Sequence, residues 1–201
     1  MSNKAFFIGD HAALDFLNTI AVLRGEVIEF IPNGESFLTW QVDAGLLDNS
    51  AINGLMDKFG KSSLNRVAGE ARELREWFRQ ALQETVRAPA GKLAKDMIAT
   101  LNQILANDSA YRQLQGTAGQ VVLREIRKIT KAQQLLIPIA QKLAELLTTV
   151  DRSLIKRCAN PNCTLWFYDQ TKAHRRLFCS PSVCGNRTKV AAFRKRQNKS
   201  N

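Results

Sequence analysis

The spacing of apolar and polar residues predicts a body built mostly from helices. Between Ser62 and Val86, apolar side chains recur every three or four positions, and glutamates sit close to arginines between them. This period is typical of a long amphipathic helix that buries one face. Similar shorter stretches predict further helices near Asp10, Ser36, Asn49, Leu93 and Pro138, the first ending at Gly25 and the third at Gly60.

Alternating patterns predict a few short strands. Residues 4–8 form one candidate, and residues 25–32 form a second that stops at a proline. Residues 111–129 are strand-like on both sides of a glycine-containing turn, which indicates a hairpin. The sequence therefore predicts an α+β, mostly helical N-terminal domain with short strands over residues 1–150. A small C-terminal module over residues 151–201 follows it.

The positive charge of the chain is concentrated in this C-terminal module. The 201 residues carry 29 Lys and Arg against 18 Asp and Glu, a net charge of +11. Residues 1–155 hold 18 basic and 17 acidic side chains, whereas residues 156–201 hold 11 basic side chains and one acid, Asp169. A neutral body with a basic end suits a polyanionic partner. A solvated basic tail is the alternative for residues 194–201.

Other features narrow the cellular setting. The chain has no apolar run of about 18 residues, so we expect no membrane-spanning helix and no membrane partner. The N-terminus lacks the apolar core of a secretory signal. We therefore expect a cytoplasmic protein whose thiols stay reduced.

All four cysteines lie in the C-terminal module, in two pairs. Each pair has four residues between its members, and fifteen residues separate the pairs. Turn-forming asparagine, proline and serine residues fill both short gaps, so each pair can direct two sulfurs at one ion. This plan predicts one structural Zn²⁺ per chain, with a four-thiolate iron centre or disulfides as alternatives. The predicted ligands are Cys158, Cys163, Cys179 and Cys184.

A basic helix is predicted after the last cysteine, beginning at Pro181 or Ser182. Val190 and Phe193 would anchor it on the metal module, while a basic face turns outward. Such a helix can approach a nucleic-acid duplex closely, although a merely solvated face is the alternative. The candidate contacts are Arg187, Lys189, Arg194, Lys195 and Arg196 on the helix, with Arg175 and Arg176 between the cysteine pairs as phosphate contacts.

These motifs resemble a known family. The segment LWFYDQTKAHRRLFC between the cysteine pairs, followed by CGNR and a basic helix, resembles the CGNR zinc finger. The upstream stretches LDFLNT, FLTWQVDAGLL and ARELREWFRQAL resemble its usual partner, the ABATE domain. The resemblance implies a bacterial transcription regulator whose zinc finger binds DNA, with Cys158, Cys163, Cys179 and Cys184 as the zinc ligands. It also implies an N-terminal domain that senses a ligand or stress.

The sequence thus favours a transcription regulator that binds double-stranded DNA and responds to a small-molecule effector. An RNA- or ribosome-associated zinc-ribbon protein is the main alternative, and exposed aromatic residues between the cysteines would favour it. An enzyme is not expected, because the chain lacks a nucleophile elbow, a phosphate loop and an H-E-x-x-H motif. Phe37, Trp40 and Trp77 are candidate residues of an effector pocket, with core packing as the alternative.

Overall fold

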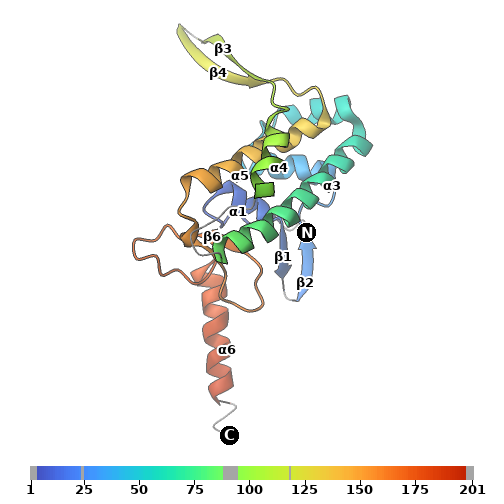
Figure 1. The fold of residues 1–201 in the computed structure, drawn as a ribbon. Coiled ribbons are helices and arrows are strands. Elements are labelled where there is room, and N and C mark those ends of the chain that lie inside the picture. The colour runs from blue at the N-terminus through green and yellow to red at the C-terminus, as the bar shows by residue number, and fades with distance from the viewer. Residues whose placement is uncertain (1–3, 24, 88–94, 118, 198–201) are drawn as a thin grey trace.

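The computed structural model describes residues 4–23, 25–87, 95–117 and 119–197 (Figure 1). A helical body carries a long hairpin at one end, and the last helix projects from the other end. The α-helices are α1 (Ala12–Leu17), α2 (Gly34–Asp43), α3 (Ala51–Arg87), α4 (Lys95–Leu105), α5 (Ile137–Thr149) and α6 (Asn186–Gln197). The strands form antiparallel pairs: β1 (Ile20–Leu23) with β2 (Glu26–Glu29), β3 (Ala110–Thr117) with β4 (Gln120–Arg127), and β5 (Ile155–Arg157) with β6 (Trp166–Tyr168). This mostly helical body with short strands is the predicted fold class.

The main hydrophobic core lies among helices α1 to α5. The stripe predicted along residues 62–86 faces this core, as the helical period requires. Each large apolar side chain that it buries contributes about 1.5–3 kcal/mol to stability. Its most buried members are Leu64, Val67, Ala68, Ala71, Phe78 and Leu82.

The long helix α3 breaks at Gly60. The backbone there has φ 69° and ψ 160°, a left-handed conformation that glycine adopts without a Cβ clash. The break separates the helix predicted to end at Gly60 from the one predicted after Ser62. Both predictions are confirmed.

The first helix is shorter than predicted. Helix α1 ends at Leu17 rather than at Gly25, and His11, not Asp10, caps its start by accepting a backbone N–H of the first turn at 3.1 Å. Residues 20–23 instead form β1 and pair with β2. So short an apolar stretch fits the helical period and the strand period equally well, and hydrogen bonding to β2 makes residues 20–23 a strand.

Two further boundaries differ from the prediction. The helix expected from Ser36 begins at Gly34, because the Asn33 side chain accepts the Ser36 N–H at 3.0 Å and caps the helix. Residues 4–8 are not a strand. They form an irregular segment, and Ala5, Phe6 and Ile8 pack on the second core described below, while Phe7 is exposed.

The predicted hairpin of residues 111–129 is confirmed as β3 and β4, which project from the body (Figure 1). Its base is held by Arg127, which bonds Asp108 at 2.7 Å and Gln141 of α5 at 3.2 Å. Pro138 lies in the first turn of α5, as predicted.

A second, smaller core joins the two ends of the chain. Ala21 and Phe30 near the first hairpin pack with Leu165 and Phe167 of the C-terminal module, together with three of its cysteines. Trp166 of β6 reaches the main core instead. The C-terminal module is therefore packed against the body through apolar side chains.

Candidate metal centre and nucleic-acid interface

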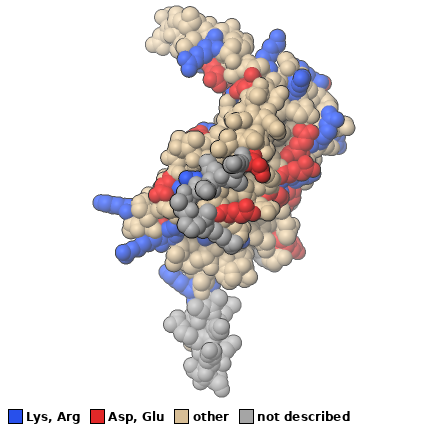
Figure 2. Space-filling view, in the orientation of Figure 1, with Lys and Arg blue, Asp and Glu red and all other residues tan. Residues whose placement is uncertain are grey.

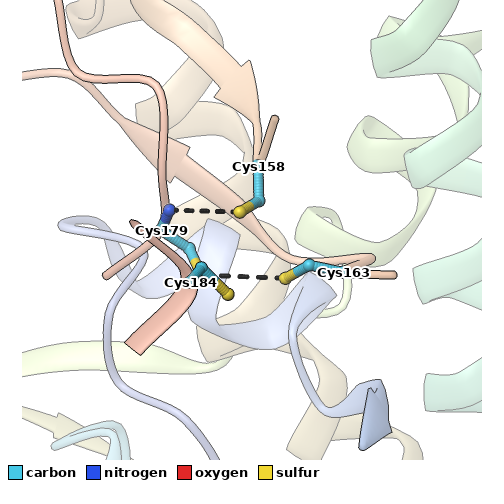
Figure 3. Close-up of side chains that lie close together, drawn as sticks. All are labelled: Cys158, Cys163, Cys179 and Cys184. Carbon is cyan, nitrogen blue, oxygen red and sulfur yellow. Dashed lines mark hydrogen bonds between the residues drawn. The ribbon is translucent and has the colours of Figure 1, made fainter. Parts of the chain in front are cut away.

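The four cysteines converge on one point although they come from separate loops (Figure 3). Cys158 follows β5 and Cys163 closes the next turn. Cys179 precedes the short helical turn of residues 181–185, and Cys184 lies within that turn. Their Sγ atoms all lie within 4.8 Å of one another, and none is in a disulfide. The pairing predicted from the spacing is therefore realised.

The geometry of the cluster fits a tetrahedral metal. Zinc–sulfur bonds of about 2.3 Å place tetrahedral sulfurs about 3.8 Å apart. The Sγ of Cys179 lies 3.7 Å from that of Cys163 and 3.5 Å from that of Cys184. The backbone N–H of Cys179 also points at the Cys158 Sγ, at 3.4 Å. Such a donor stabilises thiolate charge, and four sulfurs leave no open coordination position, so the set fits one structural Zn²⁺.

Local turns hold each cysteine pair. The Asn160 side chain accepts the N–H of Asn162 at 3.0 Å, and the Cys163 N–H bonds the Asn160 carbonyl at 2.9 Å. In the second pair, the Ser180 hydroxyl accepts the Val183 N–H at 3.3 Å and caps the turn. The asparagine and serine side chains thus have the turn-forming role that the sequence predicts.

The thiols influence one another strongly. A hydrogen bond from Cys179 lowers the pKa of Cys163, while the same contact, burial and nearby thiolate charge raise the pKa of Cys179. Burial first, and then neighbouring thiolate charge, also raise the pKa of Cys184. Charge repulsion prevents four neighbouring thiols from all ionising at neutral pH unless a cation lies between them. A bound dication would allow all four to be thiolates.

Asp169 organises the loop between the cysteine pairs. It is fully buried and accepts hydrogen bonds from the Lys156 ammonium at 2.6 Å and the Thr171 hydroxyl at 2.6 Å. The backbone N–H of Arg176 adds a third at 2.9 Å. Burial disfavours the charged form, but these donors outweigh it and hold the Asp169 pKa well below its ordinary range. The one acid of residues 156–201 is therefore neutralised inside the module.

The two arginines of this loop differ. Arg175 is exposed to solvent. Arg176 is half-buried, pairs with Asp10 of the body, and lies 4.3 Å above the Phe167 ring. Its guanidinium also donates to the Cys179 carbonyl at 2.6 Å. Arg176 thus ties the N-terminal segment, the aromatic core and the metal loop together.

Helix α6 leaves the metal centre and projects away from the body (Figure 1). Arg187 and Lys189 are exposed in its first turn. Val190 does not anchor the helix as predicted, because its side chain is 49% exposed and the helix runs outward rather than along the module. The side chains of Phe193 and of the predicted contacts Arg194, Lys195 and Arg196 lie outside the described part of the structure.

The aromatic residues between the cysteine pairs are packing residues. Trp166 is 2% exposed, Phe167 is fully buried and Tyr168 is half-buried. The Trp166 backbone bonds the side chain of Asn18 in the body, a contact that the sequence analysis missed. The available signal was weak, because Asn18 is one of three polar residues in the stretch LDFLNT.

The predicted effector-pocket residues lie around the main core. Phe37 is fully buried and Trp40 nearly so, while Trp77 is partly buried at the margin. Two hollows described below are lined by other residues. The pocket prediction for these three side chains stays a prediction.

A helical body packed against a four-cysteine metal centre with a projecting basic helix defines a zinc-finger protein. Residues 10–150 match the ABATE family, described as "Putative stress-induced transcription regulator", and residues 155–197 match the CGNR zinc finger. The chain belongs to the ABATE family and carries a CGNR zinc finger. Both descriptions concern regulators and zinc fingers rather than enzymes. No curated protein matches the chain.

Among the helices of the described residues, none combines the length and the apolar character that crossing a bilayer requires.

Proposed function

We propose that this protein binds duplex DNA through its zinc finger and that α6 enters a groove. The observation that carries the proposal is the projection of α6 from the metal centre with Arg187 and Lys189 exposed in its first turn. Twelve helical residues span about 18 Å, enough to follow a major groove across several base pairs.

The charge distribution supports the same partner. Asp169 is buried and paired with Lys156, so it cancels that one charge and leaves the exposed basic side chains of the module without an acidic neighbour from residues 156–197. Figure 2 shows Lys and Arg side chains projecting around the lower end of the molecule, where the loops of the zinc finger lie. Exposed Arg175 adds a phosphate contact beside the helix, whereas Arg176 holds the loop that presents it.

The candidate DNA contacts have different proposed roles according to their position on α6. Arg187 is the candidate for reading a base edge, because it is in the first turn, where recognition helices commonly meet bases. Lys189, Arg194, Lys195 and Arg196 would bind phosphates. Phosphate contacts supply most of the affinity and its salt dependence.

The alternative function, RNA binding, depended on exposed aromatic side chains on which bases could stack. Trp166 and Phe167 are buried instead, and Tyr168 is half-buried.

The body is proposed as a non-catalytic sensor domain over residues 1–150, acting on the zinc finger over residues 151–201 in the cytoplasm. Its direct bonds to the finger support this role, since the backbone N–H of Tyr168 bonds the Gly9 carbonyl at 2.8 Å and Arg176 pairs with Asp10. A change in the body therefore reaches the element that presents α6.

The test is a selection from random duplex DNA with zinc-loaded protein, run beside a random RNA pool. We expect a duplex motif to be enriched, and the zinc-loaded Arg187→Ala variant to lose preference at one position of it. Arg112→Ala removes the same charge from the exposed β3 hairpin far from α6 and serves as the matched control. Enrichment of RNA alone, or of neither pool, contradicts the proposal.

A further inference from the structure

A hollow of about 290 Å³ lies at the junction of body and zinc finger. Helix α3 contributes Glu76 and Arg79, and the finger contributes Arg157 and Trp166. The first hairpin contributes four apolar residues, and two polar residues complete the wall: Ile20, Ala21, Val22 and Val27, with Gln83 and Thr164. Its size is at the lower end of small-molecule sites, and it combines an apolar wall with charged groups.

The charges around the hollow are unbalanced. Arg79 and Arg157 both line it, but Glu76, the one carboxylate among the described residues that line it, is shared by Arg79 and the buried Arg75, at 3.2 Å and 2.8 Å. Glu29 does not neutralise Arg79 or Arg157, because both of its carboxylate oxygens bind Arg75, at 2.8 Å and 2.7 Å. Two positively charged guanidiniums therefore line the hollow, and the single carboxylate beside them is also bound to Arg75.

The like charges interact. Arg79 has a side chain only 18% exposed, and it donates to the Leu17 carbonyl at the end of α1. Burial lowers its pKa first, Glu76 opposes that shift, and the charges of Arg75 and Arg157 lower it further. Arg157 lies 5.8 Å from the Trp166 ring and remains exposed. A bound anion would relieve this repulsion.

We infer that the hollow binds a small carboxylate joined to an apolar body. The carboxylate pairs with Arg157 in the planar geometry that guanidiniums favour. Arg79 adds a further bond from Nη1, because its Nε faces Glu76 and its Nη2 donates to Leu17. The apolar part lies on Val22 and Val27. The larger hollow of about 1330 Å³ is a poorer anion site, because three of the cysteines, Cys163, Cys179 and Cys184, line it and carry thiolate charge when they hold the metal.

This site deepens the proposed function, since it names the chemistry of the effector and where it acts. A ligand between Arg79 and Arg157 bridges α3 of the body to β5 of the finger, next to Cys158. Coupling to DNA rests on the proposed function, whereas binding of the ligand does not. Binding is therefore measured on the zinc-loaded full chain without DNA.

The probe is benzoate, compared with neutral benzamide and with acetate at equal ionic strength. We expect benzoate to raise the melting temperature by roughly 3–5 °C at ten times its dissociation constant, with benzamide and acetate far weaker. A benzoate shift no larger than those of benzamide and acetate overturns the inference, whatever the DNA result.

Charge variants locate the site. Arg157→Gln should weaken benzoate binding at least tenfold, and Arg157→Glu should abolish it, because the new carboxylate occupies the place of the ligand beside Arg79. Arg175→Gln loses the same charge on the exposed loop and should bind benzoate like the parent protein. Zinc content is checked in each variant. Benzoate binding that survives in Arg157→Glu overturns the assignment.

Discussion

The side chain of Asn18 and the backbone of Trp166 exchange two hydrogen bonds across 148 positions of sequence. Asn18 Nδ2 donates to the Trp166 carbonyl at 2.9 Å, and the Trp166 N–H donates to Asn18 Oδ1 at 2.8 Å. Asn18 is fully buried at the end of α1. One amide therefore satisfies both backbone groups of the β6 residue and fastens the zinc finger to the body.

Replacing Asn18 with Ala should destabilise the whole protein by about 2–4 kcal/mol. The change leaves a buried N–H and a buried C=O of Trp166 without partners, and each costs about 1–3 kcal/mol unpaired. Urea unfolding followed by tryptophan fluorescence measures the loss. Asn102→Ala on the exposed face of α4 should change stability by under about 0.5 kcal/mol. Equal stabilities of the two variants would contradict the role assigned to this bond pair.

Loss of the metal should disturb more than the zinc finger. We expect one zinc per chain by elemental analysis, and its loss in Cys184→Ser. Because the cysteines pack with Ala21 and Phe30, amide exchange should rise in the first hairpin as well as in β5, β6 and α6. The main core should stay protected.

Ser182→Ala is the matched control for this experiment. It lies on the same turn as Cys184 but provides no sulfur, so zinc and amide protection should be retained. Native protein without zinc would refute the metal assignment, and unchanged exchange in the first hairpin of Cys184→Ser would refute the shared core.

The parts of the fold that follow local rules could be predicted from sequence. The stripe along residues 62–86, the stop at Gly60 and the proline at the start of α5 each depend on neighbouring residues alone. Strand β1 was missed because four apolar residues fit a helix and a strand equally well, and only pairing with β2 distinguishes them.

The functional site, like the fold, was predictable from sequence only where it depends on neighbouring residues. The metal ligands were predictable because each cysteine pair lies on one short turn. The internal bonds of Arg176 were not, since its partner Asp10 is 166 positions away and the sequence of the loop suggests only an exposed basic run. The hollow beside Arg157 needs three segments of the chain together, so no local pattern reveals it.

Two glycines in helices should respond in opposite directions to alanine. At Gly34, an added Cβ would lie 2.4 Å from the Leu64 Cβ and 2.7 Å from a backbone carbon of α3, so α2 must move away. Gly34→Ala should cost about 1–3 kcal/mol or more. At Gly54 no atom lies within 4 Å, and alanine should stabilise the helix by about 0.5–1 kcal/mol. Thermal unfolding compares them, and a stabilising Gly34→Ala would contradict the close packing of α2 on α3.

The salt dependence of DNA binding tests the proposed interface of α6. Each phosphate contact that is lost should reduce the slope of log K against log salt by about 0.9 on duplex DNA. We expect this for Lys189→Ala and Lys195→Ala. Arg187→Ala should instead cost about 1–3 kcal/mol on the preferred site and relax the preference at one base pair, because a base contact carries sequence information.

Titration at several salt concentrations measures both effects, with zinc content checked first in each variant. Arg112→Ala on the β3 hairpin keeps the same change in net charge but lies far from α6, so its slope should equal that of the parent protein. A slope for Arg112→Ala that falls as far as those of the α6 variants would indicate an effect of net charge and not the loss of a local phosphate contact. Slopes and affinities that match the parent in every α6 variant would show that this helix is a solvated basic surface and not the DNA contact.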